Sequence, residues 1–275
     1  ADGKLLVAGS MAQTAAPGTY ILLLRRYNAN GSVDTSFGLS GFAIERILGT
    51  PYVYGYANSV AVQTDGKIVV AGGYYSSANQ LAPAIFRFTA RGELDTTFGT
   101  DGRWALPLGT GGAWNITIFK NRILALLDAD LVALRSLDGS LDTSFGAGGF
   151  AHLGIIPRAL AVNLKRDMLV VGGNSIYADG AGLTFPRLQY FKSDGTPDMN
   201  HGAGGIVSLD FAAPECLQDV NAVYSLDTQG GDGKVLVVAA NYAITVLFNQ
   251  ANVFRLRTDD SLDAFFGTGG FVARC

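Results

Sequence analysis

The sequence predicts an all-β fold, a β-propeller of five blades with about four antiparallel strands each. Two observations predict it. First, 36 of the 275 residues are glycine, set among short runs of Val, Ile, Leu, Phe and Tyr, without apolar recurrence at helical spacing over any dozen residues. Second, one acidic turn recurs five times along the chain. Four strands repeated every 40–60 residues are typical of propeller blades, whereas the repeats of a solenoid, the alternative, are usually shorter.

The repeated turn is an eight-residue segment with an aspartate at its fourth position and a glycine at its last, and in four of the five copies its first residue is also glycine. Its first copy reads GSVDTSFG over residues 31–38. The aligned acids of the five copies are Asp34, Asp95, Asp142, Asp198 and Asp263. They lie 61, 47, 56 and 65 residues apart, and another glycine follows each closing glycine three residues later. A constant turn at variable spacing predicts one structural unit per copy, with insertions in the loops.

A second landmark precedes each acidic turn, and it is an apolar run that in most copies follows Asp-Gly. Examples are DGKLLVAG over 2–9 and DGKIVVAGG over 65–73. Asp-Gly before such a run predicts a hairpin, because glycine takes the positive φ of the turn. With a further short strand before most of these runs and one after each turn, every unit has about four strands. The first unit starts at its second strand, so we expect the first blade to lack one strand.

These landmarks divide the chain into five units within a single β-propeller domain over residues 1–275. The expected units cover roughly residues 1–50, 57–110, 111–155, 157–213 and 217–275.

The unit resembles the delta-sixty repeat family of bacterial proteins. The resemblance is carried by Asp2-Gly3-Lys4, Asp65-Gly66-Lys67, Arg26-Tyr27 and Arg87-Phe88 together with the acidic turns, and it covers essentially the whole chain. The third unit lacks the Asp-Gly turn, and the fourth has His201 in place of phenylalanine. The resemblance implies a propeller-like fold and an extracytoplasmic location (secreted, periplasmic or cell surface). It implies no catalytic residue.

The five aspartates suggest either turn capping or calcium binding. A calcium loop needs oxygen ligands at alternate positions, but Arg91 occupies such a position in the second copy. We therefore expect Asp34, Asp95, Asp142, Asp198 and Asp263 to accept backbone N–H bonds in their turns, and we expect no metal. The phenylalanine three residues later is expected to be a core plug between blades. The preceding arginines (Arg26, Arg87 and Arg255) are expected to pack their stems and bind a carbonyl or an acid, and an inter-blade salt bridge stays open.

Enzyme motifs are sparse in this sequence. It contains no G-x-S-x-G, H-E-x-x-H, Walker or C-x-x-C motif, and only two histidines and three glutamates. We expect no cofactor. A carbohydrate-active hydrolase would need at least two carboxylates at the mouth of the propeller channel. The aspartates not assigned to turns, which keep that alternative open, are Asp128, Asp130, Asp210 and Asp227.

The net charge of the chain and the length of its apolar runs indicate which kinds of partner to expect. The net charge is −3 and the basic residues are scattered, so no nucleic-acid surface is expected. The apolar runs are far shorter than the ~20 residues of a membrane helix, so no membrane insertion is expected.

Tyrosines cluster in three segments that we expect to be loops, over residues 49–59, 72–83 and 172–186. The candidate ligand-binding residues in them are Tyr52, Tyr54, Tyr56, Tyr74, Tyr75 and Tyr177. Tyrosine among Asn, Ser and Gly suits a glycan or protein ligand, although the rings can also simply cover blade edges. The predicted function is a non-catalytic secreted or cell-surface binding or scaffold propeller. The alternatives are the hydrolase and a structural module of a larger surface assembly.

The two cysteines, Cys216 and Cys275, are 59 residues apart, which is about one repeat. Equivalent points on neighbouring blades lie close together, so we expect a disulfide that pins the C-terminal segment. Two free thiols are the alternative.

Overall fold

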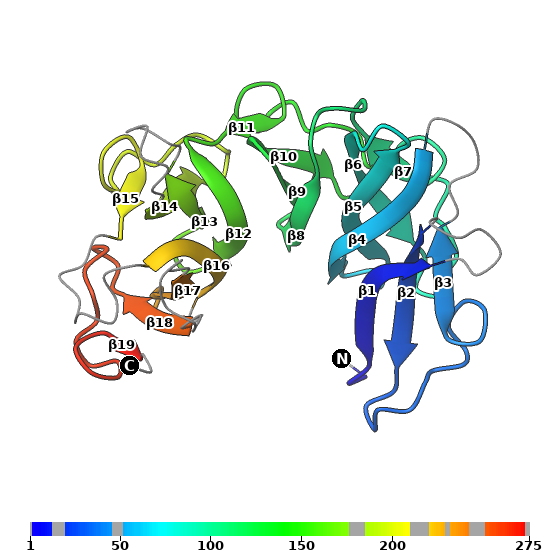
Figure 1. The fold of residues 1–275 in the computed structure, drawn as a ribbon, viewed down its shortest axis with the longest axis horizontal. Coiled ribbons are helices and arrows are strands. Elements are labelled where there is room, and N and C mark those ends of the chain that lie inside the picture. Colours follow the sequence, from blue (N-terminus) through cyan, green and yellow to red (C-terminus); the bar gives the residue numbers. More distant parts are fainter. Residues whose placement is uncertain are drawn as a thin grey trace. The chain divides into compact units, whose positions relative to one another are not determined.

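The computed structural model describes residues 2–12, 20–45, 52–175, 185–209, 220–228, 232–241 and 251–272. Nineteen strands lie within these ranges and form five sheets (Figure 1). No helix in the part of the chain described here is long and apolar enough to cross a membrane.

The first sheet has three strands, in the order β1-β2-β3. Its strands are β1 (Leu5–Ala12), β2 (Tyr20–Tyr27) and β3 (Phe42–Glu45). The second sheet has four strands in chain order, β4 (Tyr52–Val62), β5 (Ile68–Ser76), β6 (Leu81–Phe88) and β7 (Arg103–Ala105).

The other three sheets also have four strands each. The third contains β8 (Ala113–Phe119), β9 (Arg122–Leu127), β10 (Asp130–Arg135) and β11 (Phe150–His152). The fourth contains β12 (Ile155–Asn163), β13 (Met168–Ser175), β14 (Pro186–Lys192) and β15 (Ile206–Ser208). The fifth contains β16 (Val220–Thr228), β17 (Val235–Asn241), β18 (Ala251–Leu256) and β19 (Phe271–Val272).

Every sheet is a meander, because strands that are neighbours in the chain are neighbours in the sheet. The pairs within the first sheet, for example, are antiparallel throughout. A four-stranded antiparallel meander is the blade of a propeller. The predicted all-β fold, with blades of about four strands and a first blade that lacks one, is therefore confirmed.

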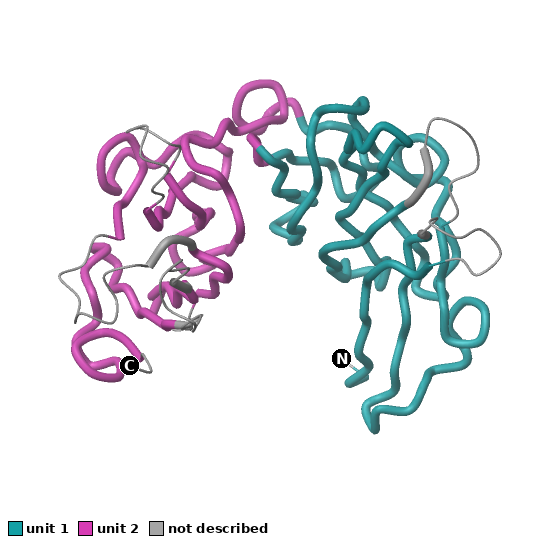
Figure 2. The backbone as a smooth tube through the Cα atoms, in the orientation of Figure 1, with its two compact units in different colours: residues 1–128, 132–142 teal, residues 129–131, 143–275 magenta. Residues whose placement is uncertain are grey.

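The chain divides into two compact units, which Figure 2 colours separately. One consists of residues 1–128 and 132–142, the other of residues 129–131 and 143–275. Each has its own apolar core. The first core includes Leu24, Phe37, Val70, Phe86 and Phe88, and the second includes Val170, Leu188, Tyr190, Val237 and Leu256. The single closed domain over 1–275 stays a prediction.

The expectation of loops was wrong for residues 52–59, 72–76 and 81–83, which belong to strands, whereas residues 77–80 do connect β5 to β6 as a turn. Strand β4 already starts at Tyr52 and β5 continues to Ser76, so that Tyr54 lies opposite Tyr75 and Tyr56 opposite Gly73. Tyrosine is a good strand former, and two register shifts in β4 accommodate the longer pairing.

Candidate functional site

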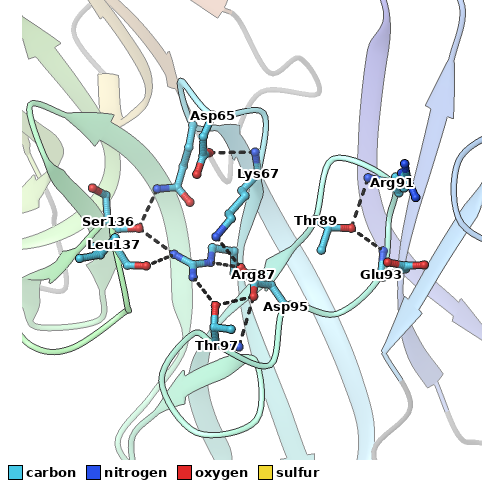
Figure 3. Close-up of polar contacts among 11 residues, drawn as sticks. Asp65, Lys67, Arg87, Thr89, Arg91, Glu93, Asp95, Thr97, Ser136 and Leu137 are labelled. Carbon is cyan, nitrogen blue, oxygen red and sulfur yellow. Dashed lines mark hydrogen bonds and ion pairs between the residues drawn. The ribbon is translucent and has the colours of Figure 1, made fainter.

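The turn aspartates are bonded to the residues that follow them. One carboxylate oxygen of Asp95, Oδ1, accepts the backbone N–H of Thr97 at 3.2 Å and its hydroxyl at 2.6 Å (Figure 3). Asp34 accepts the same pair of bonds from Ser36, and Asp198 accepts two from Asn200. Asp263 accepts the N–H of Phe265 at 3.3 Å. Each bond joins residues i and i+2, as in an Asx turn.

The second oxygen of the carboxylate binds two cations. Asp95 Oδ2 lies 2.7 Å from Arg87 Nε and 3.0 Å from Lys67 Nζ. The same arrangement recurs where Arg26 and Lys4 meet Asp34, and where Arg255 and Lys234 meet Asp263. The lysine of each Asp-Gly-Lys turn thus pairs with the acid of its own unit, a role that the sequence did not reveal.

The arginine also reaches the next blade. Arg87 is fully buried, its Nη1 donates to the carbonyls of Ser136 and Leu137 at 2.7 and 2.9 Å, and its Cζ lies 4.6 Å from the centre of the Phe98 ring. Figure 3 shows these bonds converging on Arg87. Phe98 itself is fully buried.

The phenylalanine lies against the turn glycine of the following blade. A Cβ atom at Gly139 would come within 2.4 Å of the Phe98 ring, and one at Gly92 within 2.9 Å of Phe37. Close by, the N–H of Gly99 donates to the carbonyl of Asp138 at 2.7 Å. We call the Asp, Arg and Phe of one unit, together with the turn glycine of the next unit, a blade joint. The prediction that the phenylalanine is a core plug between blades is confirmed for Phe37 and Phe98.

Hydrogen bonds and neighbouring charges lower the pKa of three joint acids, Asp34, Asp95 and Asp263. The hydrogen bond from Lys4, followed by that from Ser36, holds the pKa of Asp34 well below its usual range. The Lys234 ammonium is the main cause that lowers the pKa of Asp263 to about 2. Burial by itself raises the pKa of Asp95, but hydrogen bonds from Thr97 and Lys67 outweigh it and bring the value to about 2. Within the described ranges, no group of three or more His, Cys, Asp or Glu side chains is arranged to hold a metal ion.

The third unit keeps the joint with a different cation. Leu134 occupies the position of the arginine, and Arg122 occupies that of the Asp-Gly-Lys lysine. Arg122 Nε lies 2.6 Å from Asp142 Oδ2, so the acid retains a charged partner. The fourth unit departs further and is described below.

A separate cluster of aromatic rings lies at the start of β8. The rings of Tyr56 and Tyr75 are 5.3 Å apart, and those of Tyr56 and Trp114 are 6.5 Å apart with an interplanar angle of 34°. Trp114 is 39% exposed, and its indole N–H donates to Asp128 Oδ1. We call Tyr56, Tyr75, Trp114 and Asp128 the aromatic platform.

Two glycines hold this platform. The N–H of Gly112 donates to Asp128 Oδ2 at 3.3 Å, and a Cβ there would lie 2.8 Å from Trp114 Cζ2. A Cβ at Gly111 would lie 2.1 Å from Asp128 Oδ2. The backbone therefore packs directly against the acid and the indole, which fixes the exposed ring by contacts on two sides.

The predicted tyrosines have different locations. Tyr56 and Tyr75 belong to the platform. Tyr74 lies in the core, edge-on to Phe86, and its hydroxyl accepts a bond from Arg103 at 3.2 Å. The side chains of Tyr52, Tyr54 and Tyr177 lie outside the described part of the chain, as do Cys216 and Cys275, so the disulfide stays a prediction. Trp114 was missed, although it is one of only two tryptophans and stands two residues after a Gly-Gly pair.

Two clefts lie within the first compact unit. One, of about 740 Å³, is lined among others by Glu45, Glu93, Arg91 and Ser36. Burial raises the pKa of the Glu45 carboxyl against the opposing charge of Arg103, whose guanidinium is 3.5 Å away. The other cleft, of about 640 Å³, is lined by residues of the turns after β4 and β8 and by the end of β10.

Of the four unassigned aspartates, Asp128 belongs to the platform. Asp130 pairs with His152, and Asp227 accepts the N–H of Thr228. Asp210 lies outside the described residues.

Comparisons with known proteins agree with the fold. Residues 1–37 and 63–98 match the family model described as a domain of unknown function, DUF5122, β-propeller. These segments contain the first two Asp-Gly-Lys turns and, up to the phenylalanine, the first two acidic turns. Together with the five meander sheets, the match defines a β-propeller repeat protein. A search of the curated proteins found no match.

Several solved structures are similar at low identity. The WD40 domain of Neurospora crassa Pan2 has 12% identity and a TM-score of 0.44, covering 79% of this chain and 50% of that one. This chain therefore spans half the length of that relative. A nidogen/laminin complex has 12% identity and a TM-score of 0.46, covering 93% and 86%. A putative exo-β-1,3-galactanase from Bifidobacterium bifidum s17 has 10% identity and a TM-score of 0.45, covering 99% and 88%. None of these similarities assigns an activity or a partner to this chain.

Proposed function

We propose that this protein is a non-catalytic, extracytoplasmic binding propeller of the delta-sixty repeat type, and that it holds a glycan on the aromatic platform. The observation that carries the proposal is the exposed indole of Trp114. Its N–H donates to Asp128, which also accepts the N–H of Gly112. The Tyr56 ring lies beside the indole, and Tyr75 lies next to Tyr56.

A fixed, exposed aromatic ring suits a sugar for two reasons. The C–H face of a pyranose packs on a flat ring, and a ring that is already ordered loses little conformational entropy on binding. Asp128 is exposed and adds a hydrogen-bond acceptor for sugar hydroxyls beside the ring. A stacking face next to a carboxylate therefore matches the alternating apolar and hydroxylated surfaces of an oligosaccharide.

The blade joints support a structural rather than a catalytic role for the turn aspartates. The carboxylates of Asp34, Asp95 and Asp263 each bind an arginine and a lysine. Because these carboxylates form ion pairs within the fold, we assign ligand binding to the aromatic platform instead.

Tryptophan fluorescence tests the proposal directly, because the chain has only Trp104 and Trp114. The Trp104→Phe variant leaves Trp114 as the reporter. It is titrated with a panel of neutral and acidic oligosaccharides, beside a Trp104→Phe/Tyr75→Ala variant. We expect a saturable change of emission with some of the panel, and an affinity at least several-fold weaker without Tyr75. Absence of saturable change up to millimolar concentrations of the whole panel would contradict the proposal.

One observation favours hydrolysis as a second candidate. Glu45, a buried carboxyl of raised pKa, lines the same cleft as Glu93. A carboxyl of raised pKa together with a second carboxylate in one cleft is the combination that glycoside hydrolysis uses. A screen with nitrophenyl glycosides tests this candidate. Turnover that is abolished by Glu45→Gln and by Glu93→Gln would support a hydrolase. Turnover that neither change affects, or the absence of any turnover by the wild type, would exclude this cleft as a hydrolytic site.

A further inference from the structure

The joint between the fourth and fifth units differs from the others at three positions at once. Tyr190 stands where the first, second and fifth units have arginine, and His201 stands where the other four units have phenylalanine. In the fifth unit, Asp260 stands at the position of the turn glycines Gly92 and Gly139. At those glycines a Cβ would collide with the preceding phenylalanine ring. The aspartate and the histidine therefore replace a Phe–Gly contact as a pair.

The replaced residues contact one another closely. His201 Nδ1 lies 2.6 Å from Asp260 Oδ2, and its Nε2 lies 3.1 Å from Nη2 of Arg166. The Tyr190 ring stacks on the imidazole at 4.1 Å with an interplanar angle of 13°. His201 is 2% exposed, and all four residues belong to the second compact unit.

These contacts define the proton arrangement of the ring. A guanidinium only donates hydrogen bonds, so Nε2 of His201 accepts from Arg166. The proton of the neutral ring then lies on Nδ1 and is donated to Asp260. In this state the positive Arg166 and the negative Asp260 balance each other on opposite sides of an uncharged imidazole.

Protonation of Nε2 would disrupt this balance. The new N–H would face the guanidinium, the bond from Arg166 would be lost, and the buried imidazole would carry a positive charge next to that of Arg166. Two further ionisable groups lie on the elements around His201. Burial, followed by the charge of Asp260, raises the pKa of Tyr190 well above its usual value, so its hydroxyl stays protonated. Asp198, in the same turn as His201, accepts two bonds from Asn200 through its Oδ1.

We propose that this cluster is a proton-sensitive device that loosens the joint between the fourth and fifth blades as the pH falls from about 8 to 5, a range in which the phenylalanine joints do not respond. Histidine is the side chain whose charge ordinarily changes between about pH 5 and 8. The contacts of the folded state favour the neutral imidazole of His201, whereas the unfolded chain has no such preference. The joint is therefore fully stable above that range and loses stability as the pH falls through it.

Hydrogen–deuterium exchange at about pH 7.5 and 5, corrected for the intrinsic exchange rate, tests the proposal in the intact chain. The informative amides are those of Tyr190 and Asp198, which bond to the carbonyls of Gly205 and Tyr190. The equivalent amide of Asp95, bonded to Arg87 in a phenylalanine joint, is the internal control. We expect opening at the fourth unit to become about tenfold more frequent at the lower pH, while the control changes less than twofold. Equal changes at both places would overturn the proposal.

The double variant His201→Phe/Asp260→Gly restores the residues of the other joints. We expect it to fold and to lose the pH dependence of exchange at Tyr190 and Asp198, and an unchanged pH dependence would overturn the proposal. Should this variant fail to fold, ¹⁵N NMR of a His152→Gln variant reports on His201 alone, since the chain has two histidines. We expect the His201 ring to be in its neutral Nδ1–H form at neutral pH. We expect it to become protonated over the same pH range in which exchange at Tyr190 and Asp198 increases. A ring already charged at neutral pH, or still neutral once exchange has risen, would contradict the mechanism.

Discussion

The ring of Phe98 lies against Gly139 of the next blade, so closely that a Cβ at Gly139 would be 2.4 Å from the ring. The same relationship joins Phe37 to Gly92 at 2.9 Å and Phe145 to Gly195 at 2.7 Å. The residues that recur most faithfully in the sequence therefore make contacts between successive blades.

Replacing Gly139 of a blade joint with alanine should destabilise the fold more than the same change at Gly31. The two glycines have a similar positive φ, but only at Gly139 would the added Cβ meet another side chain. At Gly31, φ is +82° and no described atom lies within 4 Å of an added Cβ, so Gly31→Ala should cost about 1 kcal/mol from backbone strain alone. Gly139, at φ +75°, adds a collision with Phe98, so Gly139→Ala should cost about 2 kcal/mol more. Urea unfolding of both variants measures the difference. Equal losses would show that the ring contact is unimportant.

Removing the buried arginine should be costly because it leaves its partners behind. Arg87→Leu leaves Lys67 as the remaining cationic partner of Asp95 and removes the arginine donor from the carbonyls of Leu137 and Ser136, of which Ser136 keeps a bond from Gln63. We therefore expect a loss of about 3 kcal/mol. The exposed Arg91 is the matched control, and Arg91→Leu should change stability by less than about 0.5 kcal/mol. Similar thermal shifts for the two variants would count against the joint.

Acid should weaken the joints in a defined window. The pKa of Asp95 is lowered to about 2. A depressed carboxyl stabilises the fold fully above its ordinary pKa of about 4, and this contribution is lost as the pH falls toward the folded value. Unfolding midpoints measured from about pH 5 to 2 should therefore fall more steeply for the wild type than for Asp95→Asn, which is less stable at pH 5 but lacks this titration. Parallel curves would indicate that Asp95 does not contribute.

The platform glycine gives a test of ring position without removal of the ring. Gly112→Ala places a methyl group 2.8 Å from Trp114 and 3.0 Å from the Tyr56 hydroxyl. The indole must move, so oligosaccharide affinity should fall about tenfold, which corresponds to about 1.4 kcal/mol. The titration of Trp114 fluorescence measures it, with circular dichroism to verify the fold. Unchanged affinity would place the ligand elsewhere.

The sequence predicted the blades well because their signals are local. Asp-Gly before an apolar run and the Asp…Phe-Gly turn specify hairpins from a few neighbouring residues, and they recur with every unit. Two of the three tyrosine-rich segments were misread as loops, because Gly, Ser and Asn in them resemble turn signals, whereas the pairing between β4 and β5 extends both strands.

The site was harder to predict because its contacts join distant residues. Lys67 and Asp95 are separated by 28 residues, and Trp114 and Asp128 by the whole of β9. The lysine of Asp-Gly-Lys looked like a hairpin residue, and Asp128 like an unassigned acid. The His201–Asp260 pair was visible only as two isolated departures from the repeat, and the structure brings them together.

The measurement that tests the account most directly is a glycan-array screen of the wild type beside Trp114→Ala, in calcium and again in chelator. We predict binding to a defined set of glycans that survives chelation and falls about 30-fold, or about 2 kcal/mol, without the indole. Binding that disappears in chelator would contradict the structural role of the joint aspartates. Binding that is indifferent to Trp114, or no glycan binding in either buffer, would contradict the platform as a glycan site.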